Sequence, residues 1–152
     1  LVGARFERHG YTRFTTSIVN RDHEIMQGLT PFSSYDESYM HARHNPDKIV
    51  LERRSNESGN TSDPAGEPYT WVRTHGSGRV FYTAWGHNYR TWDHPDFQRL
   101  LARGIRWACK QPVEPSSAFK PELAVAAAAI DVATPSMTKP TFDEKKFTFK
   151  DV

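Results

Sequence analysis

The feature of this sequence that most constrains its fold is an apolar segment followed by a Gly-His pair and then by a helical pattern. Residues 80–85, Val-Phe-Tyr-Thr-Ala-Trp, are apolar on both faces except at Thr83, which is typical of a central strand covered on both sides. After Gly86-His87, a helix is predicted to begin near Asp93, whose side chain can cap free N–H groups. Apolar residues then recur at helical spacing, at Phe97, Leu100, Leu101, Gly104, Ile105 and Ala108. Because one face of this helix should pack on a sheet, the pattern predicts an α/β domain.

Further strands are predicted from local composition and turn signals. Residues 14–19 are rich in Thr, Ile and Val, which favours a strand. In residues 34–42, the side chains of successive residues would point to opposite faces of a strand, so that every second residue shares one face. The sequence His75-Gly76-Ser77-Gly78 lies between two apolar segments, and its glycines permit the tight turn of a β-hairpin. We therefore expect a hairpin that joins residues 69–74 to residues 79–85.

The composition excludes several functional classes. The twenty Lys and Arg residues are interleaved with eighteen Asp and Glu residues, for a formal charge of +2, so the basic stripe of a nucleic-acid-binding protein is missing. No apolar run approaches the roughly twenty residues that cross a bilayer. The single cysteine, Cys109, cannot form an internal disulfide. With 152 residues, the chain has room for one domain with one core.

His87 is the best candidate for a functional residue. A buried strand followed by a glycine, an ionisable side chain and an amphipathic helix places that side chain at the carboxyl edge of an open α/β sheet, where ligands bind. An imidazole there could act as a general acid or base, or bind a metal in its neutral form. The alternative is that His87 only hydrogen-bonds the loop between strand and helix, and its position alone leaves both interpretations open.

A second candidate surface lies on the strand predicted at residues 34–42. Alternation along this strand places four polar or aromatic side chains on one face: Tyr35, Glu37, Tyr39 and His41. A carboxylate between aromatic rings could hold a sugar or orient a catalytic imidazole. The alternative, which the residues alone favour, is an ordinary half-exposed strand with a polar outer face.

The histidines also raise the question of a metal site. His41 and His44 are three residues apart, and His9 is a further imidazole. No cysteine or paired carboxylate completes a recognised ligand spacing, so we assign no metal ligands and no cofactor, and a divalent metal is left open.

Several short stretches together resemble the ThuA-like (trehalose-utilisation) family in order and spacing, over about two thirds of the chain. The most specific are Asp36-Glu37-Ser38-Tyr39 and the stretch from Gly78-Arg79-Val80-Phe81-Tyr82-Thr83 to Gly86-His87; Gly28-Leu29, Pro68 to Trp71 and Phe97 to Trp107 accompany them. The resemblance implies a flavodoxin-like, class I glutamine amidotransferase-like fold, with a parallel sheet flanked by helices. It also implies that the N-terminal part of that fold is missing here.

The same resemblance implies a role in carbohydrate metabolism, on trehalose or keto-sugars. His87 resembles the histidine that completes the triad of amidotransferase relatives, but the nucleophile elbow is absent, so glutaminase chemistry is not expected. Carried over residue by residue, His87 and Glu37 are the expected catalytic residues. Tyr39, His9 and Trp85 are expected to contact the sugar.

The resemblance also suggests how the chain is organised. Residues 1–112 are expected to be the C-terminal part of a ThuA-like domain. Residues 113–152 are expected to be a linker with a short Ala-rich helix that leads to a further domain. This connector resembles that of long bacterial envelope proteins, which favours the periplasm or cell envelope, with the cytoplasm as an alternative. Two functions follow: a sugar-active enzyme domain, or a non-catalytic carbohydrate-binding or interaction module of a larger dehydrogenase- or cytochrome-type protein.

Overall fold

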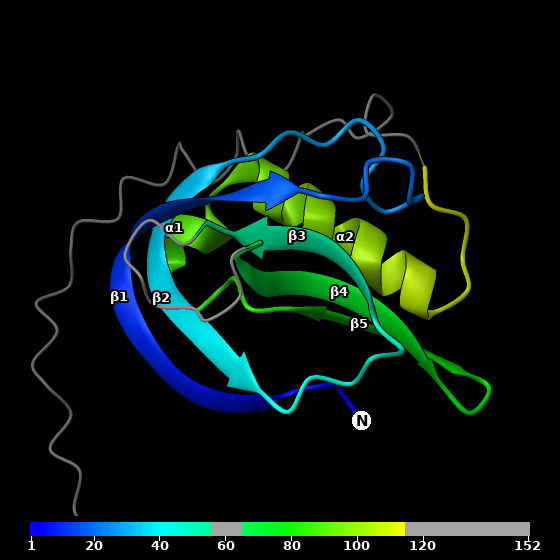
Figure 1. Ribbon diagram of the computed structural model, residues 1–152. Coiled ribbons are helices and arrows are strands. Elements are labelled where there is room, and N and C mark those ends of the chain that lie inside the picture. Colours follow the sequence, from blue (N-terminus) through cyan, green and yellow to red (C-terminus); the bar gives the residue numbers. More distant parts are fainter. Residues whose placement is uncertain (56–64, 115–152) are drawn as a thin grey trace, which may run out of the picture. The chain divides into compact units, whose positions relative to one another are not determined.

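The described part of the chain forms five strands followed by two helices (Figure 1). The structure is a computed structural model that describes residues 1–55 and 65–114, all within one compact unit, Leu1–Pro121. The strands are β1 (Arg5–Ile18), β2 (Ser33–Ala42), β3 (Ile49–Arg54), β4 (Glu67–His75) and β5 (Gly78–Thr83), and the helices are α1 (Tyr89–Trp92) and α2 (Pro95–Ala108). The strand order in the sheet is β2-β1-β3-β4-β5, and every neighbouring pair is antiparallel.

This topology shows that the predicted parallel, flavodoxin-like and amidotransferase-like sheet is wrong. Parallel neighbours need a crossover connection of a dozen or more residues, usually a helix. The connections β1–β2, β2–β3 and β4–β5 contain no helix, and β4 and β5 are joined by a turn of only two residues, Gly76 and Ser77. Both helices follow the last strand instead of alternating with the strands.

The sheet curls into a half-barrel because β1 changes partner along its length. β1 pairs with β2 from Arg5 to Thr15 and with β3 from Thr16 to Ile18. Figure 1 shows the long β1 and β2 ribbons bending together away from β3, β4 and β5. A bulge at Glu7, between the pairs Phe6↔His41 and Arg8↔Met40, adds to the bend.

The free edge of β2 is covered by side chains from the opposite side of the half-barrel. The Tyr69 hydroxyl donates to the Glu37 carbonyl at 2.5 Å, and the backbone N–H of His41 donates to Glu67 Oε1 at 3.0 Å. Arg54 Nη2 donates to the Tyr39 carbonyl at 3.5 Å. These contacts give hydrogen-bond partners to edge groups that would otherwise template pairing with another chain.

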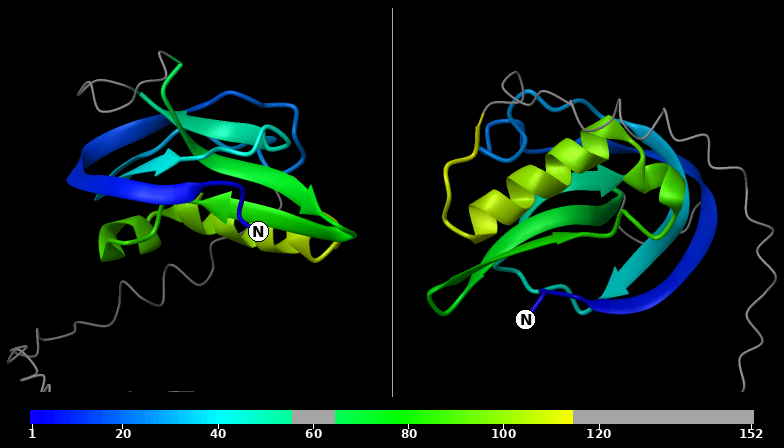
Figure 2. Two further views of the ribbon diagram at one scale, coloured as in Figure 1. Left: turned by 60° about the horizontal axis from the view of Figure 1, so that its bottom comes forward. Right: turned by 180° about the vertical axis from the view of Figure 1, so that it is seen from behind.

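The core lies between the sheet and α2, which runs along one face of the sheet beside β5 (Figure 2). Phe97, Leu100 and Gly104 of α2 are buried, as the helical spacing predicts, but Ile105 is 53% exposed. Gly104 lets the helix approach β5 closely, because a Cβ at this position would lie 2.3 Å from the Phe81 ring. Arg103 is 5% exposed and donates from Nε to the Ile25 carbonyl at 2.6 Å.

The prediction of a central, doubly covered strand at residues 80–85 is wrong. β5 has a strand neighbour on one side only, and Val80 to Thr83 are all partly exposed. Phe81 packs toward α2, while the ring of Tyr82 stacks on that of Trp71 with 4.1 Å between ring centroids. An apolar edge strand between a helix and an aromatic ring has the same composition as a buried central strand.

Local predictions agree better with the structure. The β4–β5 hairpin is confirmed, and so is the strand predicted at residues 34–42, which is β2. The helix is confirmed, but it begins at Pro95 and its N-cap is His94, because Asp93 ends the short α1 helix. β1 is 14 residues long, whereas the sequence predicted a strand of only six residues. The first nine residues were missed because they are exposed on both faces and carry no apolar alternation.

One prediction falls almost entirely outside the described residues. The linker and Ala-rich helix expected within residues 113–152 fall on residues 115–152 except for the first two positions. The boundary at residue 112 therefore stays a prediction. In the part of the chain that the structure describes, neither helix has the length and apolar character needed to cross a membrane.

Candidate functional site

The register of β1 with β2 gathers polar and aromatic side chains on one face of this strand pair. His9 pairs with Tyr39, Tyr11 pairs with Glu37, and directly paired residues project to the same face. The Tyr11 ring also contacts the Tyr35 ring, with 4.7 Å between their centroids. This strand pair therefore displays a carboxylate, an imidazole and several phenol rings together.

Glu37 is the centre of the cluster. Its Oε1 lies 3.3 Å from Nε2 of His87 and 3.5 Å from Nδ1 of His9. The Glu37 side chain is 11% exposed, whereas the side chains of His87 and His9 are 53% and 45% exposed. A nearly buried carboxylate thus lies within ion-pair distance of two imidazoles that solvent or a ligand can reach.

Tyr39 and Tyr11 border this cluster. Burial, followed by a hydrogen bond to Glu37 and the charge of that carboxylate, raises the pKa of Tyr39, so its hydroxyl keeps its proton. The Tyr11 ring lies edge-on to His87, with 6.2 Å between centroids. Asn88 donates from its side-chain amide to the Tyr11 hydroxyl.

The loop that carries His87 is held by Asp36, which the sequence analysis placed in a family motif without giving it a role. Asp36 accepts hydrogen bonds from the backbone N–H groups of Gly86 and Asn88, each at 2.8 Å, and from the Thr91 hydroxyl at 2.7 Å. Gly86 has a φ of 112°, which favours glycine, and this allows the chain to turn directly after the apolar segment. Asp36 is completely buried, so it has a structural role as the anchor of the loop.

A second hydrogen-bonded group lies beside the cluster, around His41. His41 Nδ1 lies 2.8 Å from the Glu67 carboxylate, which accepts its hydrogen bond, and its Nε2 is hydrogen-bonded to the Tyr82 hydroxyl at 2.9 Å. Burial raises the pKa of Tyr82 to about 12. The side chain of His41 is 2% exposed, so this predicted surface residue is buried between β2, β4 and β5.

The structure brings together four of the five predicted site residues. Glu37, His87, His9 and Tyr39 meet at the cluster. Trp85 does not, because it is 5% exposed and stacks on Phe14 in the core with 4.4 Å between ring centroids. Tyr11 was missed; it is two residues from His9 on the same strand, but residues 5–13 had not been interpreted as a strand.

The histidines do not assemble into a metal centre in residues 1–55 and 65–114, where no group of three or more His, Cys, Asp or Glu side chains is arranged to hold a metal ion. His44 lies beside the buried pair, with Nε2 3.9 Å from Glu67 Oε1. Burial lowers the pKa of His44, so its imidazole is predominantly neutral at pH 7.

The fold and the cluster define a class: a curled antiparallel β-domain, backed by a C-terminal helix, with a His-Glu-His cluster on its β1–β2 strand pair. A family model described as "ThuA: Trehalose utilisation" matches residues 1–108. The chain belongs to the ThuA family, as the sequence resemblance predicted.

Two solved structures of ThuA-like proteins share this fold. One, from Bacteroides uniformis ATCC 8492, aligns with a TM-score of 0.55 and 20% identity over 70% of this chain and 48% of its own. The other, from Parabacteroides merdae ATCC 43184, aligns with a TM-score of 0.54 and 22% identity over 74% of this chain and 43% of its own. The chain thus spans less than half the length of these relatives. No curated protein matches it significantly.

Proposed function

We propose that this domain binds a carbohydrate at the His9–Glu37–His87 cluster and that His87 transfers a proton to or from the bound sugar. The observation that carries the proposal is the 3.3 Å contact between His87 Nε2 and the nearly buried Glu37 carboxylate. Glu37 lies within ion-pair distance of the imidazole, where it can orient the ring toward a bound ligand. The description of the family model, trehalose utilisation, supports a sugar as the ligand.

The surroundings of the cluster suit a polyol. Tyr39 and Tyr11 offer hydroxyl groups and ring faces next to Glu37 and His9, so hydroxyl-rich ligands can receive hydrogen bonds and pack against aromatic surface. Sites of this kind combine apolar walls with a few fixed polar groups, which set the orientation of the ligand.

A second candidate function is a carbohydrate-binding module without catalysis. It is favoured by the exposure of aromatic rings beside the cluster, since Phe6 is 51% and Tyr11 is 42% exposed. Phe6 contacts the Tyr39 ring with 5.2 Å between centroids. Exposed aromatic rings next to polar groups are typical of a binding surface, and they carry no acid or base.

The test is binding and turnover of trehalose and keto-disaccharides by the full-length protein, with and without a divalent metal. For the enzyme, His87→Ala should lower turnover by about 10²- to 10⁴-fold while binding changes little. The exposed histidine of the hairpin provides a matched control, so His75→Ala should leave turnover unchanged.

Each alternative has its own result. Binding without turnover that survives His87→Ala but is lost in Tyr11→Ala would support the module and refute the enzyme. Failure to bind any of these sugars would refute both proposals.

A further inference from the structure

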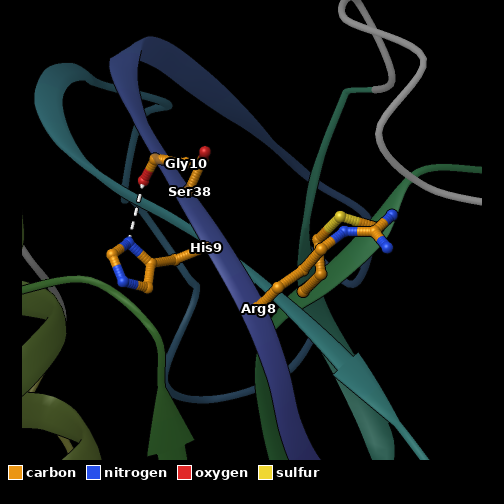
Figure 3. A pocket seen from close by; sticks show the side chains of 5 residues that line it. Arg8, His9, Gly10 and Ser38 are labelled. Atoms are coloured by element: carbon orange, nitrogen blue, oxygen red, sulfur yellow. Dashed lines mark hydrogen bonds between the residues drawn. The ribbon is translucent and has the colours of Figure 1, made fainter.

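A small cavity lies between β1 and β2, next to the Glu37 cluster, with which it shares His9. It has a volume of about 160 Å³ and is lined by Arg8, His9, Gly10, Ser38 and Met40 (Figure 3). We name it the Arg8 cavity. In Figure 3 the side chains of Arg8 and His9 project to opposite sides of β1. Since water occupies about 30 Å³ per molecule in the liquid, this volume suffices for a small polyatomic ion.

Gly10 keeps the cavity open. Gly10 pairs with Ser38, and a Cβ at position 10 would lie 2.9 Å from Ser38 Oγ. Any side chain larger than hydrogen would therefore press on the Ser38 hydroxyl and occupy space in the cavity. The φ of Gly10 is not positive, so glycine is favoured at this position by the lack of space for a side chain and not by an unusual backbone conformation.

The cavity wall contains hydrogen-bond donors without protein partners. Arg8 makes no ion pair or hydrogen bond with any residue in the described part of the chain. Ser38 is only 4% exposed, and its hydroxyl also lacks a hydrogen-bond partner among residues 1–55 and 65–114. Ser38 Oγ is not among the fully buried side-chain atoms that lack a partner, so the hydroxyl is open to the cavity, where a ligand or water can accept its hydrogen bond.

Arg8 and Ser38 are placed to act on one ligand. Arg8 pairs with Met40, and Ser38 is two residues from Met40 along β2, so Arg8 and Ser38 are diagonal neighbours on the same face. Side chains at such positions start about 7 Å apart, within reach of a shared small group. A guanidinium fork and a hydroxyl donor together match the oxygens of a carboxylate or a phosphate.

We propose that the Arg8 cavity is a binding site for a small oxyanion, the phosphate ion or the carboxylate of an organic acid. Arg8 supplies the charge and a planar pair of donors, and Ser38 donates a further hydrogen bond. Arg8 and Ser38 belong to the face of the strand pair opposite to that of Glu37, whereas His9 lines the cavity and also contacts Glu37, so the two sites are neighbours that share His9.

The test is an NMR titration of the 152-residue protein with sodium phosphate and with sodium acetate, at constant ionic strength and with chloride as reference. Saturable shifts at the Gly10 and Ser38 amides are expected for phosphate or for acetate. Saturation by phosphate alone identifies a phosphate site, and saturation by acetate alone identifies a carboxylate site.

Three variants make the test specific. Arg8→Gln should weaken binding by at least about tenfold, because a charged hydrogen-bond donor is lost. Gly10→Ala should also weaken binding, because it narrows the cavity, and a native-like amide spectrum checks that it folds. Arg13→Gln is the matched control, since Arg13 lies on the same strand but pairs with Tyr35, and it should leave affinity unchanged.

The proposal is overturned if neither anion gives saturable shifts, or if chloride produces the same shifts. It is also overturned if Arg8→Gln and Arg13→Gln weaken binding equally, because that result indicates general attraction to a basic surface.

Discussion

The buried carboxyl group of Glu52 is expected to make the stability of this domain depend on pH. Glu52 is 2% exposed, and burial raises its pKa from the ordinary value of 4.5, although hydrogen bonds from Thr70 and Thr16 oppose the rise. Thr16 Oγ1 donates to Glu52 Oε1 at 2.8 Å, and Thr70 Oγ1 lies 2.6 Å from Oε2. No lysine or arginine of residues 1–55 and 65–114 forms an ion pair with it.

A protonated Glu52 fits this network. A proton on Oε2 can be donated to Thr70 Oγ1, which can donate in turn to Thr83 Oγ1 at 3.0 Å. Every hydroxyl then has a partner, and no unpaired charge is buried.

The sign of the pH effect follows from proton binding. Above pH 4.5 the unfolded chain loses the Glu52 proton while the folded domain keeps it, so the folded state binds more protons. The free energy of unfolding therefore falls as pH rises from 4.5 to the folded-state pKa, by up to about 1.4 kcal/mol per pH unit for one proton. Below pH 4.5 both states hold the proton, and this group adds no pH dependence.

Glu52→Gln tests the reasoning, because the amide keeps the shape and the hydrogen bonds of the neutral acid but cannot ionise. The variant should match the wild type near pH 4 and become more stable than it as the pH rises from 4.5 to the folded-state pKa of Glu52. Urea unfolding followed by fluorescence of the buried Trp71 and Trp85 measures both proteins. The same substitution at the exposed Glu7 is the control. A difference between variant and wild type that stays constant with pH would refute a raised pKa at Glu52.

Three further predictions concern single contacts. Tyr69→Phe removes the donor to a buried carbonyl of β2, and should lower the free energy of unfolding by about 1–3 kcal/mol in urea titrations; an unchanged midpoint would contradict this. Gly104→Ala places a Cβ 2.3 Å from the Phe81 ring and should destabilise by about 1–3 kcal/mol in thermal melts, despite the better helix propensity of alanine; a higher Tm would argue against close packing. Burial lowers the pKa of Lys48 to about 8, so at pH 8 it should acylate faster than the exposed Lys110, as measured by mass spectrometry, and equal rates would rule out the lowered pKa.

The elements that sequence reasoning predicted correctly are those whose signals are local. Gly76 and Ser77 between two apolar segments predict the β4–β5 hairpin, because the turn residues and both strands are adjacent in the sequence. The apolar spacing from Phe97 to Gly104 predicts α2 because the helical period is repeated over the whole segment.

The topology could not be predicted in this way, because it depends on which strands pair. Residues 80–83 are apolar on both sides, and that composition fits a central parallel strand as well as an edge strand between a helix and Trp71. The first nine residues of β1 are exposed on both faces, so no apolar alternation marks them, and their strand structure comes from pairing with β2.

The candidate site depends both on residues that are adjacent in the sequence and on the way the strands pair. Asp36 and Glu37 are adjacent on β2 and project to opposite faces, yet both contact the loop that follows β5. This is possible because β2 is the edge of the sheet, so the loop can pass around it. Gly86 and Asn88 bind Asp36 through their backbone N–H groups, and His87 between them then reaches over the edge to Glu37. Glu37 and His87 are 50 positions apart in the sequence, and only the placement of β2 at the sheet edge explains why they meet.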